Sequence, residues 1–329
     1  MAAMRRRALG RSGIDVSALG LGCWAIGGPA WRGENADGWG GVDDAESERA
    51  IRAAIDLGVT FFDTADVYGA GHSERVLGRA LAARRSSVVI ATKFGNTFDE
   101  ASRQLGAGDA SPQYIRAACD ASLRRLGTDS IDLYQFHLGS YAAARAAEVR
   151  ETLEGLVAAG KIRAYGWSTD LPDRARIFAA GAHCTSVQNR LNVVEDAPEM
   201  LRLCDELGLA SINRGPLAMG LLGGRYTAES VLPADDVRGP KSPPWMRYFE
   251  AGRPRPEWIA KIEALRGILT SSGRTLAQGA LAWVWARSAR TVPIPGFKTL
   301  AQVRENAGAM DRGPLSESQM SEIDRVLAR

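Results

Sequence analysis

The feature that most constrains the fold is a local pattern that recurs along the 329-residue chain. In each occurrence an amphipathic helical stretch ends at a glycine, and a short apolar or β-branched run follows within a few residues. The glycines are Gly58, Gly127, Gly160, Gly181 and Gly208. A glycine suits the left-handed position after the last helical turn, because it has no Cβ to clash there. The pattern therefore predicts alternating helices and strands.

Eight short runs are predicted as strands, and helices separate most of them. They are Leu19–Gly22, Thr60–Thr64, Val88–Lys93, Ile131–His137, Lys161–Ser168, Thr185–Gln188, Ala210–Asn213 and Val292–Pro295. Strands that alternate with helices run parallel, and about eight such units favour a closed (β/α)8 TIM barrel over an open sheet. We expect one such domain over residues 1–329, with extra helices at its C-terminal end. A β-hairpin of Arg7–Leu9 and Asp15–Val16 is predicted to cap the barrel bottom.

Composition limits the partners and the compartment. The chain has 41 Lys and Arg against 38 Asp and Glu, a near balance that argues against nucleic acid as the main partner. The apolar run Ala280–Ala286 is far too short to span a membrane, so no membrane partner is expected. Four cysteines are scattered without CxxC spacing, and the chain has three histidines. We therefore expect reduced thiols in a cytoplasmic protein, and no metal site.

Polar residues of unusual kinds stand at the last positions of the predicted strands. They are Asp63, Lys93, His137, Ser168, Gln188 and Asn213. In a barrel the C-terminal strand ends build the active site. Side chains alternate along a strand, so Asp63 shares a face with Phe61, and Lys93 shares a face with Ala91. We expect these polar side chains to point together into the barrel mouth.

Ordered motifs extend over nearly the whole chain. They are GLGCW (20–24), FFDTADVYG (61–69), ATKFG (91–95), DLYQFH (132–137), GWST (166–169), VQNRLNVV (187–194), GPLAMGLLGG (215–224) and PIPGFKTLAQVRENA (293–307). In this order and spacing the chain resembles the aldo-keto reductase family. The resemblance implies an NADPH-dependent oxidoreductase that reduces an aldehyde or ketone, sugar-like or small, to an alcohol. The substrate, the physiological direction and the oligomeric state stay open at this point.

The resemblance also implies a catalytic tetrad of Asp63, Tyr68, Lys93 and His137. Carbonyl reduction needs a hydride at carbon and a proton at oxygen, and a tyrosine with a pKa of about 10 is a weak acid at neutral pH. A neighbouring lysine ammonium would favour the phenolate and make Tyr68 a better proton donor, with Asp63 keeping the lysine charged. His137 is expected to hydrogen-bond the substrate oxygen.

For NADPH or NADP⁺, the resemblance places Ser168 and Gln188 against the nicotinamide amide. Lys298 would pair with the adenosine 2′-phosphate and so favour NADPH over NADH. The expected cofactor contacts are Gly22, Cys23, Trp24, Asp63, Ser168, Gln188, Asn213, Arg214, Pro216, Leu217, Gly220, Leu222, Pro295, Gly296, Phe297, Lys298, Thr299, Gln302, Glu305 and Asn306. The expected substrate contacts are Trp24, Tyr68, His137 and Trp245.

Arg214 departs from the family pattern. Many relatives have an aromatic residue, often tyrosine, that stacks under the nicotinamide just before the Pro-Leu pair, here Pro216 and Leu217. A planar guanidinium can stack in the same place, but its charge would disfavour the oxidised, cationic ring. We therefore expect Arg214 to tighten the reduced cofactor relative to the oxidised one, unless a nearby carboxylate neutralises it.

Two other functional hypotheses stay open at this level. Lys93 at a strand end is also the place of a Schiff-base lysine in a barrel aldolase. Some members of the resembled family bind NADPH and modulate a partner such as an ion channel, so a regulatory subunit with little turnover is a second alternative. Turnover with small aldehydes would separate that alternative from the reductase.

Two segments are interpreted from their local chemistry. Gly20-x-Gly22-x-x-Ala25 matches the dinucleotide-binding fingerprint, but that motif must open a helix, and a Gly- and Trp-rich loop follows here. We therefore predict that it is not such a site. The Pro- and Gly-rich stretch from Gly223 to Pro256 is too long for a passive connection, and we predict a functional loop there.

Overall fold

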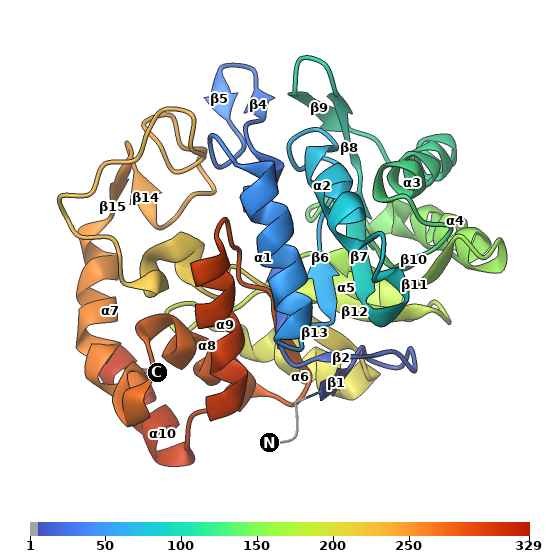
Figure 1. Ribbon diagram of the computed structural model, residues 1–329. Helices are drawn as coiled ribbons and strands as arrows, with labels where there is room; N and C mark the ends of the chain where they lie inside the picture. Colours follow the sequence, from blue (N-terminus) through green and yellow to red (C-terminus); the bar gives the residue numbers. More distant parts are fainter. Residues whose placement is uncertain (1–5) are drawn as a thin grey trace.

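The computed structural model describes residues 6–329, and in that part of the chain eight parallel strands form a ring at the centre (Figure 1). The strands are β3 Gly20–Gly22, β6 Phe61–Asp63, β7 Val89–Phe94, β10 Ile131–Phe136, β11 Ile162–Ser168, β12 Cys184–Arg190, β13 Ala210–Arg214 and β16 Thr291–Pro293. Neighbours in the order β16-β13-β12-β11-β10-β7-β6-β3 are hydrogen-bonded. The predicted TIM barrel is confirmed, and each predicted strand has its counterpart.

The two glycines of the apparent fingerprint close this ring. A parallel bridge joins Gly22 to Gly296, and the Gly22 N–H donates to the Pro295 carbonyl oxygen at 3.0 Å. A Cβ at Gly22 would lie 2.9 Å from the carbonyl oxygen of Ile294, and one at Gly20 would lie 2.5 Å from the Phe61 ring. No α-helix opens after them, because residues 25–27 form a short 3-10 turn. The glycines therefore allow close strand packing, as a barrel seam requires.

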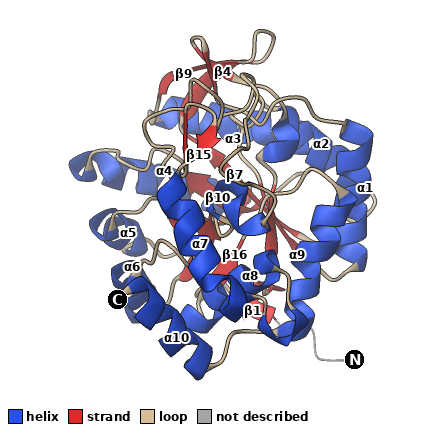
Figure 2. Cartoon of the chain, turned by 90° about the vertical axis from the view of Figure 1, so that its left-hand side faces the viewer, coloured by secondary structure: helices blue, strands red, loops and turns tan. Residues whose placement is uncertain are grey.

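Helices surround the ring, as Figure 2 shows from the side. They are α1 Asp44–Asp56, α2 His72–Leu81, α3 Pro112–Leu126, α4 Ala146–Ala158, α5 Pro172–Ala179, α6 Pro198–Leu207, α7 Pro256–Leu269, α8 Leu276–Arg287, α9 Leu300–Arg312 and α10 Glu317–Leu327. Helix α10 packs against α7, so the predicted extra C-terminal helices are confirmed. In the part of the chain that the structure describes, no helix is long and apolar enough to cross a membrane.

Most glycines predicted to end helices adopt the left-handed conformation. Gly58, Gly127, Gly160 and Gly208 have φ between 63° and 86°. The prediction is wrong for Gly181, whose φ is not positive. A Cβ there would lie 1.7 Å from the Tyr165 hydroxyl oxygen, so this position needs a glycine for space.

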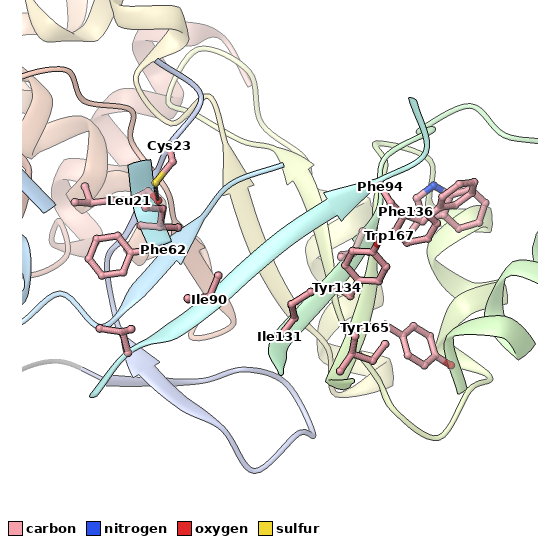
Figure 3. Packing of buried hydrophobic residues seen from close by; sticks show 14 of the residues in the cluster. Leu21, Cys23, Phe62, Ile90, Phe94, Ile131, Tyr134, Phe136, Tyr165 and Trp167 are labelled. Atoms are coloured by element: carbon pink, nitrogen blue, oxygen red, sulfur yellow. Dashed lines mark hydrogen bonds between the residues drawn. The ribbon is translucent and has the colours of Figure 1, made fainter. Parts of the chain in front are cut away.

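Apolar side chains line both faces of the ring. Outward-facing residues pack under the helices, and Figure 3 shows Phe62 and Ile90 in this layer, with Phe94, Phe136 and Trp167 gathered farther along it. A separate cluster fills the inside of the barrel and includes Phe61, Val89, Leu133, Ala164 and Ile212. Adjacent residues in a strand point to opposite faces, which is why Phe61 and Phe62 belong to different layers.

A hairpin plugs the bottom of the barrel. Strands β1 Arg6–Ala8 and β2 Asp15–Ser17 pair antiparallel, and Leu9, Ile14 and Val16 join the inner apolar cluster. The Arg11 guanidinium donates to the carbonyl oxygens of residues 179, 181 and 184 at 2.6 to 2.9 Å. The predicted hairpin cap is therefore confirmed.

The loops at the top of the barrel contain strands that the sequence analysis did not predict. They are β4 Trp31–Arg32, β5 Asn35–Ala36, β8 Asn96–Asp99 and β9 Gln104–Gly108, which form one sheet, and the small hairpin β14 Phe249–Glu250 with β15 Arg253–Pro254. Figure 1 shows β4, β5 and β9 at the top of the molecule. Their polar, glycine-containing runs lack a strand pattern, and Trp31 pairs with the distant Gln104. Tertiary pairing therefore decides these strands.

Candidate active site

Asp63 and Lys93 form a buried ion pair at the barrel mouth. Lys93 Nζ donates to Asp63 Oδ1 at 2.5 Å and to the Thr64 carbonyl oxygen at 2.8 Å. The second Asp63 oxygen accepts N–H groups from Gln135 at 2.9 Å and from Gln188 at 2.7 Å. Lys93 is fully buried and Asp63 is 2% exposed. Charges this deep need both a counter-charge and further hydrogen bonds, and this pair has both.

Tyr68 completes the cluster from the loop after β6. Lys93 Nζ donates to Tyr68 Oη at 3.2 Å and lies 4.8 Å from the centre of its ring. The next residue, Gly69, has φ of 60°, and a Cβ there would lie 1.9 Å from the Gly27 carbonyl oxygen. This tight turn against the loop after β3 fixes the place from which Tyr68 reaches the lysine.

The protonation states follow from burial and from the ion pair. Burial raises the pKa of Tyr68, and the Lys93 ammonium offsets part of that rise, so the pKa stays above its ordinary value. The lysine thus acts on the Tyr68 pKa in the expected direction, but burial outweighs it. Burial lowers the pKa of Lys93, but Asp63 and Tyr68 raise it more, and the net pKa is raised. At neutral pH Tyr68 is therefore a protonated phenol and Lys93 an ammonium.

His137 follows β10 and faces the tyrosine. Its ring centre lies 5.9 Å from that of Tyr68, in an edge-on arrangement. Burial lowers the pKa of His137 well below its usual range, and the positive charges of Lys93 and Arg214 lower it further. Its Nδ1 is buried and has no hydrogen-bond partner among residues 6–329. His137 is therefore a neutral imidazole.

A continuous cleft runs from this cluster to the start of α9 and has a volume of roughly 1250 Å³, counted with its open mouth. Its walls include these residues of the predicted site: Gly22, Trp24, Asp63, Tyr68, Gln188, Arg214, Pro216, Leu217, Gly220, Gly296, Phe297, Lys298, Gln302, Glu305 and Asn306. The described walls do not include the predicted contacts Cys23, His137, Ser168, Asn213, Leu222, Pro295, Thr299 and Trp245, and Lys93 lies behind the wall, where it binds Asp63 and Tyr68. The structure thus brings most of the predicted set to one surface.

Asn213 points away from that surface. Ala210 and Ile212 belong to the inner cluster, so Arg214 continues their face, and Asn213 lies on the other face of β13. The Asn213 amide donates to Ser211 Oγ at 2.8 Å, and its own oxygen is buried without a partner in the described chain. The expectation that Asn213 points into the mouth is therefore corrected.

Other predicted contacts outside the walls have local roles. Ser168 is buried beside Gln188 in the β11–β12 ladder. Thr299 caps α9, because its hydroxyl accepts the Gln302 N–H at 3.3 Å. Leu222 is buried in the apolar cluster next to α8, and Cys23 is buried behind β3.

The far end of the cleft is a cationic helix start. Lys298 precedes α9, and its Nζ donates to the carbonyl oxygens of Trp39 at 2.5 Å and Gly41 at 3.0 Å. Burial lowers the pKa of Lys298 from its ordinary value. Gln302 accepts the backbone N–H groups of residues 298 and 299, while Asn306 donates to the Gly296 carbonyl oxygen at 3.4 Å. A helix N-terminus and an ammonium together attract anions.

Comparison with known proteins settles the family, because the model of the Aldo/keto reductase family matches residues 18–328. The chain belongs to this family. A probable aldo-keto reductase 1 of Glycine max is 34% identical over 96% of this chain and 86% of that protein. The solved glycerol dehydrogenase of Gluconobacter oxydans is 31% identical, with a TM-score of 0.81 over 100% of this chain and 96% of that one. The resemblance and the enzyme class expected from the motifs are confirmed.

A third relative is an aldo-keto reductase of Klebsiella pneumoniae solved in complex with NADPH. It is 27% identical to this chain, with a TM-score of 0.72, and the match covers 99% of this chain and 95% of that one. The described residues of this aldo/keto reductase contain four free, buried cysteines, as the sequence predicts. Residues 6–329 contain no cluster of three or more His, Cys, Asp or Glu that could hold a metal ion.

Several residues in or behind the cleft of this aldo/keto reductase were missed in the sequence. Gln135 donates to Asp63 from the inward face of β10, two residues before His137, so strand alternation would have found it. Arg225, Tyr226 and Arg238 come from the 223–256 segment, which was predicted to be functional without naming residues. Arg238 is buried, lies 4.3 Å from the Trp39 ring centre and donates to Tyr226 Oη at 2.8 Å. Only the folded loops reveal these contacts.

Aromatic rings form the wall beside Tyr68. Trp24 stacks on the Tyr68 ring, with the ring centres 5.8 Å apart, and meets Trp39 edge-on at 5.4 Å. Trp245 tilts against Trp24 at 6.1 Å and keeps 44% of its surface exposed. Trp245 lies outside the cleft wall itself but covers the indole that forms it.

Arg214 is paired with a carboxylate at the cleft. Its guanidinium donates to Asp170 Oδ2, and the Arg214 side chain is 34% exposed. Asp170 lies just past the end of β11, and its other oxygen accepts the Arg190 N–H at 2.7 Å. The carboxylate considered in the sequence analysis is therefore present.

Proposed function

We propose that this aldo/keto reductase uses NADPH to reduce the carbonyl group of an aldehyde or ketone, small or sugar-like, to an alcohol, with alcohol oxidation as the reverse reaction. The observation that carries this proposal is the continuous cleft between Tyr68 and Lys298. To act in this reaction, NADPH needs its nicotinamide beside the proton donor and its 2′-phosphate beside a cation. The cleft has the proton donor Tyr68 at one end and the cation Lys298 at the other.

The residues of the cleft fit this cofactor. The cleft walls include the start of α9 and the cations Lys298 and Arg225, which suit phosphate groups, whereas the buried Arg238 is already paired with Asp236 at 2.8 Å. Lys298 uses two donors on backbone carbonyls and, with three in all, keeps one for a 2′-phosphate. The NADPH-bound relative from Klebsiella pneumoniae supports the choice of cofactor. Bound there, the cofactor supplies the hydride.

Tyr68 is the proton donor in this proposal. Its phenol is protonated at neutral pH and lies at the cleft wall, where a substrate oxygen can reach it. Once the proton has left, the phenolate lies 3.2 Å from the Lys93 ammonium, which stabilises it. Asp63 holds that ammonium in place through the 2.5 Å contact. The lysine therefore lowers the cost of proton transfer although burial sets the resting pKa.

His137 supplies a neutral hydrogen bond to the substrate oxygen. Its Nδ1 is buried without a partner in the described residues, and a buried N–H left unpaired is costlier than an unpaired acceptor. We assign the proton to Nε2 for that reason, and Nε2 then donates to the oxygen that Tyr68 protonates. Trp24 and Trp245 offer apolar ring faces for the rest of the substrate.

The Schiff-base alternative does not suit the geometry of Lys93. A nucleophilic amine must be unprotonated, whereas the raised pKa of Lys93 keeps it charged beside Asp63.

The test is a screen of aldehydes, ketones and sugars for NADPH oxidation, with Tyr68→Phe as the matched variant. We expect turnover by the wild type, and a fall of about 10²- to 10⁴-fold in kcat for Tyr68→Phe with NADPH affinity nearly unchanged. NADPH binding without turnover across the panel would favour the regulatory subunit instead.

A further inference from the structure

We infer that Asp170 is a positioning residue that holds Arg214 at the catalytic end of the cleft and cancels part of its charge, so that the enzyme binds oxidised cofactor nearly as well as reduced cofactor. The inference rests on the NADPH-dependent function proposed above. It also revises the expectation that Arg214 alone favours the reduced form.

The first observation is where Arg214 lies. It is the last residue of β13, its side chain follows the inward face of Ala210 and Ile212, and it shares the cleft wall with Asp63 and Tyr68. Its positive charge acts on the two groups expected to contact the substrate oxygen, His137 and Tyr68. After burial and Lys93, Arg214 is a further cause of the lowered pKa of His137, and it also acts to lower the pKa of Tyr68. Arg214 is therefore close enough to act on any charge that forms there.

The second observation is how Asp170 is held. One oxygen accepts the backbone N–H of Arg190 at 2.7 Å, and the other binds the Arg214 guanidinium. Arg190 and Arg214 are paired residues of the β12–β13 ladder, so the carboxylate bridges the ends of adjacent strands. The Arg190 guanidinium has its own carboxylate, Glu195, at 3.7 Å. The negative charge of Asp170 therefore pairs with the Arg214 guanidinium and not with that of Arg190.

This arrangement has a thermodynamic consequence. The nicotinamide ring is neutral when reduced and positively charged when oxidised, so a bare guanidinium nearby would weaken binding of the oxidised form specifically. A carboxylate on that guanidinium turns a charge into a dipole, whose field falls off faster with distance. The pair is partly exposed, with side chains 34% and 44% accessible, so solvent screening limits the effect to about tenfold.

The experiment measures the dissociation constants of NADPH, by its fluorescence on binding, and of NADP⁺, by competition. In Asp170→Asn the side chain keeps an oxygen for the Arg190 N–H, so its place in the fold is preserved, and only the charge is lost. We expect the NADP⁺ to NADPH ratio of dissociation constants to rise about tenfold. Adding Arg214→Met to that variant removes the exposed cation and should return the ratio to within about twofold of wild type.

Asp173→Asn is the matched control, because Asp173 is exposed, pairs with Arg174 and loses the same charge three residues away. Its ratio should stay at the wild-type value. An unchanged ratio in Asp170→Asn, with both cofactors still bound, overturns the inference and leaves the reductase function intact. An equal rise in Asp173→Asn overturns it as well, since the effect would then be one of net charge. A wild type that binds neither cofactor overturns the proposed function together with the inference.

Discussion

The two ends of the barrel use the same strands for opposite purposes. Phe61 and Asp63 are two residues apart on β6, yet Phe61 belongs to the apolar cluster that the hairpin seals, whereas Asp63 holds a buried ammonium at the mouth. At the bottom, Leu9 and Val16 are fully buried against that cluster. Burying such side chains contributes about 1.5–3 kcal/mol each, while a buried ion pair contributes little net stability even when fully hydrogen-bonded.

This difference teaches that stability and activity are separable by position. The bottom is stabilised by removing apolar surface from water. This stabilisation depends on close packing of the side chains and requires no reactive groups. The top is stable only because each buried charge is matched by another. A change at the bottom should therefore alter unfolding without altering catalysis, and a change at the top should alter both or alter cofactor binding alone.

The largest effect is expected for Lys93→Met, which leaves the Asp63 carboxylate buried without its cation. The free energy of unfolding should fall by about 3–5 kcal/mol, and turnover should fall at least about a hundredfold. Urea denaturation and steady-state kinetics measure the two effects. Adding Asp63→Asn should restore much of the stability but none of the turnover. If Lys93→Met alone were as stable as the wild type, the buried Asp63 carboxylate would not need the lysine as its counter-charge.

Lys298→Met tests the part of the top that serves the cofactor. Losing a hydrogen bond to a charged phosphate costs about 1.5–3 kcal/mol, so NADPH affinity should fall about 10- to 100-fold. The affinity for NADH, which lacks the 2′-phosphate, should change less than about twofold. Fluorescence titration with both dinucleotides provides the measurement. Lys261→Met, on the exposed face of α7, is the control for loss of a positive charge. Equal losses for both dinucleotides would place the phosphate elsewhere.

Gly10→Ala tests the bottom. Gly10 has φ of 57°, and a Cβ there would lie 2.0 Å from the Thr185 carbonyl oxygen, so the hairpin must shift away from the barrel. We expect a loss of about 2 kcal/mol in unfolding free energy, with unchanged kcat/KM per folded molecule.

Gly13→Ala is its matched control, because Gly13 has φ of 71° but no atom of the described chain within 4 Å of its added Cβ. Its loss should be about 1 kcal/mol, from backbone strain alone. If Gly10→Ala lowered kcat/KM as well, the two ends would be coupled through the strands.

The smallest effect concerns pH. The folded pKa of His137 lies well below its unfolded value of about 6.5. As pH falls below about 6.5, the unfolded chain binds a proton at this residue that the folded protein does not, so the free energy of unfolding decreases. Between pH 7.5 and 5.5 the wild type should lose about 1.4 kcal/mol more than His137→Gln. Chemical denaturation at both pH values measures this. A parallel loss in the two proteins would mean that His137 is protonated in the folded state.

Much of the barrel was predictable because its signal is local and repeated. Each strand is a short apolar run after a helix, and Asp63 and Lys93 stand at the ends of two of them. The short strands β4 and β9 were not predictable, because their paired residues Trp31 and Gln104 are 73 residues apart in the chain and neither strand has an alternating pattern of its own. Asn213 was misplaced because a position at the end of a predicted strand does not fix the face: Ala210 and Ile212 point inward, so alternation turns Asn213 outward and Arg214 inward.

The sequence by itself determined the eightfold alternation, the hairpin plug and the polar strand ends, since these follow from patterns within a few residues. Tertiary structure alone decided which polar groups at the rim meet: Arg214 with Asp170, 44 residues away, and Lys298 with the Trp39 carbonyl, 259 residues away. The physical reason is that such contacts depend on the closure of the barrel, which brings loop ends together whatever their separation along the chain. The local sequence pattern sets the order of the loops around the rim, and closure of the barrel sets which loops contact one another.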